Sequence, residues 1–331
     1  MRHPVAWTLG TALLAITAAT GAWVDRPRAA LSQLPAPALG SEASCTAYDG
    51  LPPNWGHDHH AGMVWVAGGP VTLGSMDGYP EEQPVRKSQV AGFWIDRTEV
   101  TNAQFAAFVQ ATRYVTDAER SGRGVIFRAP AKGEQVAEGG WWREVRGADW
   151  QHPDGPDSDL RGRQNEPVVQ ITRRDALAYA QWLGHSLPTE AQWEFAAQGN
   201  GRSERIERGP RDSQGRPSAN FWQGIFPYLD AAEDGHRGRA GVGCYAANGL
   251  GLYDMIGNVW EWTSEPWNGP HQAHGIAPAT TAAEPGALGL IKGGSFLCSA
   301  DYCVRYRTSA RNPQELDLPT SHVGFRTVAM R

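Results

Sequence analysis

The chain has 331 residues and a formal net charge of −5, with 30 Lys and Arg against 35 Asp and Glu. This balance excludes a nucleic-acid-binding protein that depends on bulk basicity. Gly and Pro together make up about 19% of the chain, against roughly 12% in an average protein, so long helices and regular sheets should be in the minority. With 41% hydrophobic residues, the chain is too apolar to be disordered over most of its length.

The N-terminus has the pattern of an export signal. Arg2 and His3 precede the uncharged residues 4–24, and small residues at 18–22 offer a cleavage site. The uncharged stretch is also about long enough to span a bilayer, so an uncleaved membrane anchor is the alternative. In both cases residues 1–24 direct the rest of the chain to a periplasmic or extracellular location.

Residues 25–60 are interpreted as a linker. They are rich in Pro, Ala, Ser and Gly and lack the helical or alternating periodicity that would bury one face. The segment ends in His57-Asp58-His59-His60, which could bind a metal, although His residues clustered in a flexible segment are more often solvated. Residues 61–331 then form one folded domain.

The first part of this domain predicts elements of both kinds. Strands are expected at 63–66, 71–74 and 93–96, where apolar runs are bounded by turn residues. The segment 139–167 contains several Trp but is dense in Gly, Pro and Asp, which predicts ordered loops.

Three short helices should begin near Thr101, Thr172 and Thr189. Each threonine can accept hydrogen bonds from the free N–H groups of a first helical turn. The apolar positions that follow at helical spacing are Phe105, Phe108, Val109 and Thr112, then Ala176, Tyr179, Ala180 and Leu183, then Trp193, Ala196 and Ala197. We therefore predict a loop-rich α+β domain.

The chain contains four cysteines, Cys45, Cys244, Cys298 and Cys303. An even count in an exported protein suggests disulfides, and three pairings are possible. Cys298 and Cys303 are five residues apart, so their thiols can meet if the loop turns, and a small structural disulfide is one interpretation. The other is a functional dithiol, because two converging thiolates favour Cu(I), and Arg305 and Arg307 just downstream would lower the pKa of a nearby thiol.

Two loops rich in Gly and aromatic residues carry oxygen ligands. Asn220 and Asp234 lie in the first loop, and Asp254 and Glu261 lie in the second. Carboxylates, Asn oxygens and loop carbonyls suit calcium, which takes six to eight oxygen ligands. Neither loop has EF-hand spacing, so the residues alone favour surface carboxylates and turn-forming Asn.

Several runs in order along the chain carry a specific resemblance. They are LPTEAQWE at 187–194, GLGLYDMIGNVWEWT at 249–263, the segment 293–307 with its two Cys and its RYR ending, and GFR at 324–326. Over roughly 63–331 the chain resembles the formylglycine-generating enzyme (sulfatase-modifying factor) family. The glycine-asparagine-tryptophan run is shared with non-catalytic relatives, whereas the two Cys at this spacing point to the oxidase.

The resemblance implies a C-type-lectin-like α+β fold with little regular secondary structure. It also implies an activity, the copper-dependent and oxygen-consuming conversion of a Cys in a Cys-x-Pro-x-Arg segment of a sulfatase into formylglycine. The implied partners are an unfolded or nascent sulfatase polypeptide, molecular oxygen and a thiol reductant. A non-catalytic lectin-like binding module and a thiol-disulfide exchange protein are the alternatives.

The resemblance also assigns site residues. Cys298 and Cys303 would hold Cu(I), and Ser295 and Tyr302 would line the pocket. Two calcium sites would be formed by Asn220, Phe221, Asp234 and His236, and by Asp254, Gly257, Val259 and Glu261. In these sets Phe221, His236, Gly257 and Val259 would act through backbone carbonyls.

Some positions depart from the best-known members of the family. Ser299 stands where His is frequent, and His322 stands where Asn precedes the Gly-Phe-Arg ending, so both bear on substrate preference. Thr308 and Thr327 replace Cys that form disulfides in some animal members. Cys45 and Cys244 could form a disulfide of their own, although the sequence does not place Cys45.

Overall fold

The computed structural model describes residues 39–199, 209–271 and 286–330. The export signal predicted at 1–24 lies outside these residues. Within them, no helix is both long enough and apolar enough to cross a membrane. Short elements joined by long loops make up the fold, which confirms the loop-rich α+β class.

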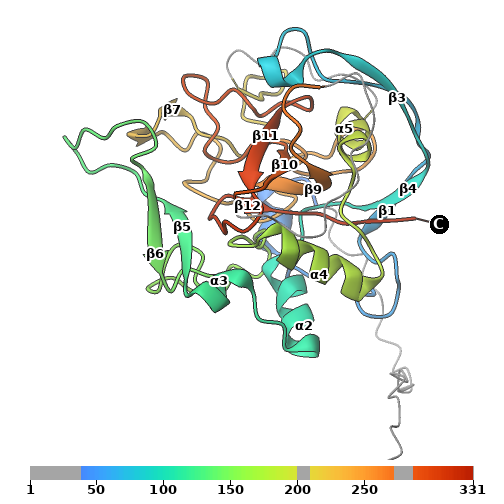
Figure 1. Ribbon diagram of the computed structural model, residues 1–331, viewed down its shortest axis with the longest axis horizontal. Coiled ribbons are helices and arrows are strands. Elements are labelled where there is room, and N and C mark those ends of the chain that lie inside the picture. The colour runs from blue at the N-terminus through green and yellow to red at the C-terminus, as the bar shows by residue number, and fades with distance from the viewer. Residues whose placement is uncertain (1–38, 200–208, 272–285, 331) are drawn as a thin grey trace, which may run out of the picture. The chain divides into compact units, whose positions relative to one another are not determined.

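Two small sheets carry most of the pairing (Figure 1). One has the antiparallel order β1-β4-β13, with β1 (Met63–Val66), β4 (Phe93–Asp96) and β13 (Val328–Ala329). The other has the order β11-β10-β9-β12, with β9 (Trp260–Pro266), β10 (Leu288–Lys292), β11 (Arg311–Glu315) and β12 (Val323–Gly324). Strand β12 runs parallel to β9, so the C-terminal Gly-Phe-Arg segment lies beside the second oxygen-rich loop.

Three further strand pairs lie outside these two sheets. They are β2 (Gly69–Leu73) with β3 (Arg86–Val90), β5 (Arg123–Phe127) with β6 (Trp142–Arg146), and β7 (Gly224–Ile225) with β8 (Leu229–Asp230). The sequence predicted only loops where β6 lies. The sequence signal for this strand is weak because β6 has no buried residue. Its extended conformation depends on pairing with β5.

The helices begin where the capping residues predict. The described helices are α1 (Glu42–Thr46), the 3-10 helix η1 (Pro80–Glu82), α2 (Asn102–Thr112), α3 (Asp117–Ser121), α4 (Arg173–Leu183) and α5 (Glu190–Gln198). Thr101, Thr172 and Thr189 are the N-caps of α2, α4 and α5, and each side chain accepts a hydrogen bond from the backbone N–H three residues on. Such a cap stabilises a helix by about 1 kcal/mol.

The core consists of large aromatic side chains between the helices and the two sheets. Phe105 and Phe108 of α2 pack against Tyr179 of α4, and Trp262 of β9 is fully buried in the same cluster. Trp193 of α5 is fully buried in a second cluster beneath the three-stranded sheet. Burial of one such side chain contributes about 2–3 kcal/mol, so these clusters fix the loops that leave the strands.

Residues 39–60 belong to the folded unit, so the linker predicted at 25–60 is wrong over this part. Cys45 forms a disulfide with Cys244, and the Gly50 carbonyl accepts a hydrogen bond of 2.5 Å from the Thr101 hydroxyl. A covalent bond and backbone contacts hold the segment, and neither leaves a periodic pattern in the sequence. His60, from the His cluster, stacks on Trp94 with ring centroids 4.4 Å apart.

Candidate active site

The loop that carries Cys298 and Cys303 leaves strand β10 through two glycines. Gly294 has a φ of +79°, and a Cβ there would lie 2.7 Å from the Arg305 carbonyl oxygen. Only glycine therefore allows the two ends of the loop to approach this closely. The Ser295 carbonyl then accepts a hydrogen bond of 2.9 Å from the Cys298 N–H, which turns the chain toward the second cysteine.

The two sulfur atoms meet inside this loop. The Sγ atoms of Cys298 and Cys303 lie 3.0 Å apart, and both cysteines are free rather than disulfide-bonded. Cys298 is fully buried, whereas Cys303 is partly exposed to the neighbouring pocket. The structure thus holds a reduced dithiol with one accessible sulfur.

A guanidinium group faces the accessible sulfur. Arg305 Nη1 lies 4.0 Å from Cys303 Sγ, and the same guanidinium is held by the Glu81 carboxylate at 2.7 Å. It also stacks on Tyr79 at 3.9 Å from the ring centroid. The arginine is therefore fixed beside the thiol.

The two thiols differ in acidity. The hydrogen bond from Cys298 lowers the pKa of Cys303 to about 7, with a further contribution from Arg305. Burial raises the pKa of Cys298 well above its ordinary value, and the neighbouring Cys303 raises it further. The proton that leaves the pair near pH 7 therefore comes from Cys303, while Cys298 keeps its own.

Ser299 shapes the loop rather than the pocket wall. Its hydroxyl is buried, donates to Asp301 Oδ1 at 2.6 Å and accepts from the Tyr302 N–H at 3.1 Å. The other Asp301 oxygen accepts a hydrogen bond from the Phe226 N–H at 3.2 Å. Ser299 is not among the residues that line the pocket. The presence of Ser where His is frequent therefore affects the shape of the dithiol loop rather than the pocket wall.

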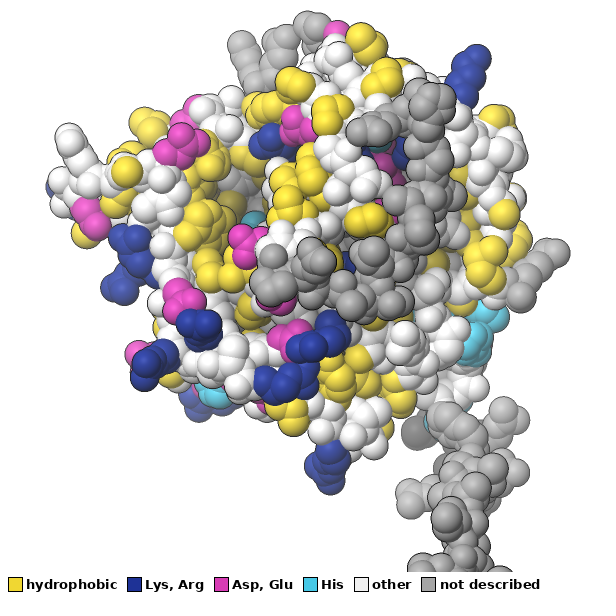
Figure 2. All heavy atoms as spheres, viewed as in Figure 1, with side chains coloured by type: hydrophobic (Ala, Val, Ile, Leu, Met, Phe, Trp, Pro, Cys, Tyr) yellow, Lys and Arg dark blue, Asp and Glu magenta, His cyan; other side chains and the backbone are white. Residues whose placement is uncertain are grey.

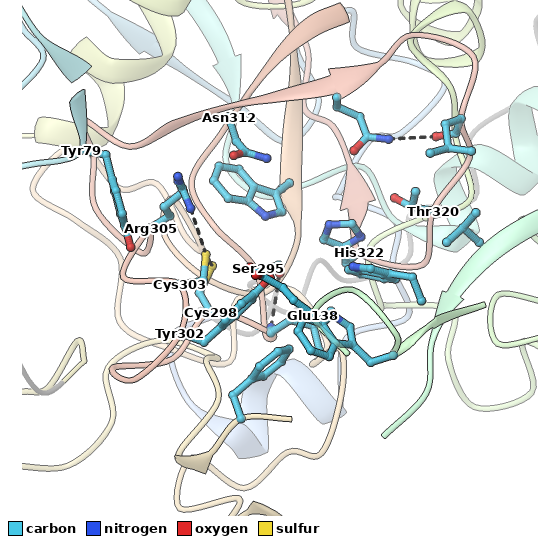
Figure 3. Close-up of a pocket in the computed structure, with 18 of the residues that line it drawn as sticks. Tyr79, Glu138, Ser295, Cys298, Tyr302, Cys303, Arg305, Asn312, Thr320 and His322 are labelled. Carbon is cyan, nitrogen blue, oxygen red and sulfur yellow. Dashed lines mark hydrogen bonds between the residues drawn. The ribbon is translucent and has the colours of Figure 1, made fainter. Parts of the chain in front are cut away.

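A cavity of about 590 Å³ opens above the sulfurs (Figure 3). Aromatic rings form part of its wall, where Tyr302 stacks on Phe226 at 4.5 Å and meets the edge of Trp141 at 5.2 Å. Ser295 and Tyr302, expected to line the pocket, both line it together with the two cysteines. A cavity of this size accommodates several residues of an extended peptide.

The cavity also contains two carboxylates that the sequence did not single out. Glu138 precedes β6 and Glu144 lies within it, and both are exposed toward the cavity. Glu144 pairs with Arg123 at 3.3 Å, whereas Glu138 has no ion pair within the described residues. They were missed because the β5–β6 pairing that brings them to the pocket was not predicted.

His322 lines the same cavity. Its ring lies 4.6 Å from that of Trp142, and its Nδ1 atom is buried without a hydrogen-bond partner in the described part of the chain. Burial lowers the pKa of His322 to about 3, with a smaller contribution from Arg239. The ring is therefore neutral near pH 7, so this departure from the frequent Asn changes shape and hydrogen bonding rather than charge.

The residues expected at the first calcium site lie together. Asp234 accepts hydrogen bonds of 3.0 Å from the Phe221 N–H and the His236 N–H through its two oxygens. The Asn220 carbonyl approaches Gly257, where an added Cβ would lie 2.2 Å from that oxygen. The two oxygen-rich loops are therefore in direct contact.

The residues expected at the second calcium site surround a buried excess of negative charge. Both oxygens of Glu261 accept hydrogen bonds of 2.7 Å from Arg326, while one oxygen of Asp254 accepts from the Gly243 N–H at 2.6 Å. Glu99 is fully buried, and neither of its oxygens accepts a hydrogen bond from the described residues. Burial raises the pKa of Glu99 well above its ordinary value, and Asp254 and Glu261 raise it further.

Glu99 was missed because one carboxylate in the loop after β4 carries no sequence signal. The buried carboxylates of Glu99, Asp254 and Glu261 all interact electrostatically with the guanidinium of Arg326, and such an excess of negative charge is costly unless a cation or a proton compensates it. Asn258 links this region to the dithiol, because its N–H donates to Asn220 and its carbonyl accepts from Phe296, both at 2.9 Å.

Comparison with known proteins is consistent with this geometry. Residues 50–331 match the sulfatase-modifying factor enzyme 1-like domain. The formylglycine-generating enzyme of Thermomonospora curvata is 45% identical over 283 residues, which cover 81% of this chain and 93% of that protein. That of Mycobacterium tuberculosis is 43% identical over 81% of this chain and 97% of that protein. The structure of PvdO from Pseudomonas aeruginosa, at 23% identity and a TM-score of 0.55 over 80% of this chain and 93% of that one, shares the fold.

Proposed function

The chain belongs to the sulfatase-modifying factor family, and from this premise we propose that it is a formylglycine-generating oxidase acting on a sulfatase cysteine. The observation that carries the proposal is the free Cys298–Cys303 pair, 3.0 Å apart at a peptide-sized cavity. A structural disulfide would leave no free thiol, and an exchange protein would not need the acidic, aromatic cavity around it.

The reaction needs an external oxidant and a reductant. It replaces the substrate's Cβ–S bond with a C=O bond. One cysteine, one O2 and two reducing equivalents with their protons give the aldehyde, hydrogen sulfide and water. A thiol reductant supplies the two electrons, and each thiol gives up one proton and one electron as it is oxidised to a disulfide.

The donor set suits Cu(I). Two sulfur ligands close together, one of which loses its proton near pH 7, are the soft donors that Cu(I) prefers, and the two Cys are too few for a closed zinc site. We propose that Cys298 and Cys303 hold the ion. When bound, copper would supply the one-electron chemistry that allows O2 to react with a thiol substrate. Arg305, fixed by Glu81, would keep the Cys303 sulfur in its charged form.

The cavity complements a Cys-x-Pro-x-Arg segment. Glu138 and Glu144 offer negative charge for the substrate's Arg, and the guanidinium–carboxylate pair would fix the register of the peptide. The Trp141 and Tyr302 rings provide an apolar wall suited to the proline. Tyr302 and Ser295 line the same cavity as the dithiol, and their hydroxyl groups would hydrogen-bond a substrate thiol or carbonyl there.

Calcium would stabilise the loops behind the dithiol. The Glu99 oxygens accept no hydrogen bond from the described residues, which supports a cation near Asp254 and Glu261, because a divalent ion would offset the buried negative charge there. Glu261 is already paired with Arg326, so we propose that Glu99 contributes ligand oxygens in addition to the expected set. The other ion would lie at the first calcium site, near Asp234.

We also propose that the folded unit works outside the cytoplasm. The Cys45–Cys244 disulfide supports this, since such bonds persist mainly in oxidising compartments. The same compartment would have to supply copper and O2 while leaving the Cys298–Cys303 pair reduced.

The function is tested by incubating a Cys-x-Pro-x-Arg peptide with the copper-loaded protein, oxygen and a thiol reductant. Mass spectrometry should detect the aldehyde, and release of hydrogen sulfide should match it in amount. A peptide with Ser in place of the Cys is the substrate control. Copper-loaded, folded protein that produces no aldehyde from any such peptide would contradict the oxidase.

The calcium proposal has its own test. Calcium should raise the Tm of the wild-type protein over that in chelator, because an ion that binds only the folded state stabilises it. Glu99→Gln should reduce this increase, while Glu144→Gln, an exposed carboxylate of the cavity, should leave it intact. An equal calcium response in the wild type and Glu99→Gln would remove Glu99 from the site.

A further inference from the structure

Exposed hydrophobic side chains gather beside the cavity. Ile225, Tyr228 and Leu229 of the β7–β8 hairpin are 61%, 49% and 56% exposed, and Tyr302 at the cavity rim is 43% exposed. We call the first three the hairpin patch. The other large exposed hydrophobics of the described residues come from five separate segments, at Met76, Val115, Trp182, Leu288 and Met330. Figure 2 shows hydrophobic side chains around the hollow on the side where Figure 1 places β7.

The fold holds this hairpin in place without using the patch. The indole N–H of Trp222 donates to the Leu229 carbonyl at 3.0 Å, and the Phe226 N–H donates to Asp301 at 3.2 Å. Gly224 allows the two strands to approach, since a Cβ there would lie 2.3 Å from the Leu229 carbonyl oxygen. The anchors are backbone groups and buried side chains, so the outward-facing apolar groups have no structural task in the described molecule.

The hairpin patch is continuous with the cavity. Phe226 follows Ile225 in the hairpin, is buried, and stacks on Tyr302 at the cavity rim. No side chain from 224 to 229 is charged. The Asp230 carboxylate that follows accepts hydrogen bonds from two backbone N–H groups nearby. A partner that enters the cavity and continues outward over the hairpin therefore meets an apolar surface.

We propose that the hairpin patch binds apolar side chains of the sulfatase polypeptide just outside its Cys-x-Pro-x-Arg core. This inference rests on the proposed function, because it extends the path of the same substrate. An unfolded polypeptide exposes such side chains, whereas a folded sulfatase would bury them. The patch thus favours substrate that has not yet folded, and it acts mainly on KM.

The test compares peptides that share one core and differ in their flanks. One has Leu and Phe on both sides of the core, and the other has Ser and Gly. Burial of two apolar side chains is enough for about a tenfold preference in kcat/KM for the apolar flanks. In Ile225→Ser/Leu229→Ser this ratio should fall to about one. Met76→Ser and Val115→Ser, which remove equally exposed apolar groups elsewhere, should keep the wild-type ratio.

Binding is measured in parallel with the core Cys replaced by Ser, using fluorescence anisotropy of the labelled peptides. This measures peptide binding to the hairpin patch in the absence of oxidation. Failure of the proposed oxidase activity and failure of the proposed binding surface are therefore distinguishable. A wild-type ratio near one, or a high ratio that survives in the double variant, would overturn the proposal. So would a concentration-dependent dimer of the wild type that the double variant abolishes, because the patch would then be an interface between copies of this chain.

Discussion

The two pairs of cysteines show how surroundings decide the chemistry of one residue type. Cys45 and Cys244 are 199 residues apart in sequence and form a disulfide within a small cluster of Ala and Tyr. Cys298 and Cys303 are five residues apart and remain thiols, one facing a cavity and a fixed guanidinium. Proximity in sequence therefore does not predict bonding. The first pair joins distant segments, and the second is positioned to react.

The largest effect on activity is expected at the second pair, Cys298 and Cys303. Cys303→Ser should lower the rate of aldehyde formation by more than about a hundredfold. Mutation of a residue that only hydrogen-bonds a metal ligand already costs up to about that much, and Cys303 is proposed as a ligand itself. Cu(I) affinity, measured by competition with a chromophoric chelator, should fall with it, while Tm changes little. Cys45→Ser/Cys244→Ser is the matched control and should retain Cu(I) affinity. If both variants bind Cu(I) equally, the roles assigned to the two pairs are wrong.

Removal of the first pair should affect stability instead. A cross-link between residues 199 apart restricts the unfolded chain, and its loss should cost about 5 kcal/mol in the free energy of unfolding. Denaturant unfolding of Cys45→Ser/Cys244→Ser measures this cost, and aldehyde formation well below its Tm should persist. An activity loss as large as that of Cys303→Ser would show that the disulfide also positions the dithiol.

The sequence predicted best where the physical cause is local. The caps at Thr101, Thr172 and Thr189 each involve bonds within three residues, and all three helices begin there. The sequence could also suggest the dithiol, because only four residues separate Cys298 from Cys303. The family resemblance supplied most of the remaining site, through motifs rather than through periodicity.

What the sequence could not provide depends on long-range contacts. The linker prediction failed over 39–60 because a disulfide and contacts with distant segments hold that part. Glu138 and Glu144 reach the cavity only through the pairing of β6 with β5. Glu99 is a candidate ligand because its oxygens are buried and accept no hydrogen bond from the part of the chain that the structure describes, which only the three-dimensional structure reveals.

The pH dependence should separate the two pairs further. In metal-free protein the pKa of Cys303 is about 7 in the folded state, below its ordinary value of 9.0. Ionisation of this thiol therefore stabilises the fold, and the contribution is complete at a pH above 9.0. This contribution is lost as the pH falls through about 7. Arg305→Gln should raise the pKa of Cys303 by up to about one unit, since it removes the facing positive charge. The disulfide has no such titration.

This shift is measured in metal-free protein as the pH dependence of Cys303 alkylation by iodoacetamide, with the modified residue located by mass spectrometry. Arg123→Gln is the matched control, since it removes an exposed guanidinium that pairs with Glu144 at the same cavity. The same shift in both variants would mean that the charge of the whole cavity, rather than Arg305, acts on the thiol.

The smallest effect is expected from the serine inside the dithiol loop. Ser299→Ala removes a hydroxyl that bonds both Asp301 and the Tyr302 N–H, at a cost of about 1 kcal/mol. Both thiols remain, but the loop that holds them together becomes less ordered, so Cu(I) affinity should fall by about fivefold. Ser44→Ala is the matching change beside the other pair, because the Ser44 hydroxyl bonds Ser41, the N-cap of the helix that carries Cys45. The Cu(I) affinity of Ser44→Ala should equal that of the wild type. A covalent bond preserves the geometry of the first pair when its surroundings loosen, whereas the second pair depends on each hydrogen bond of its loop.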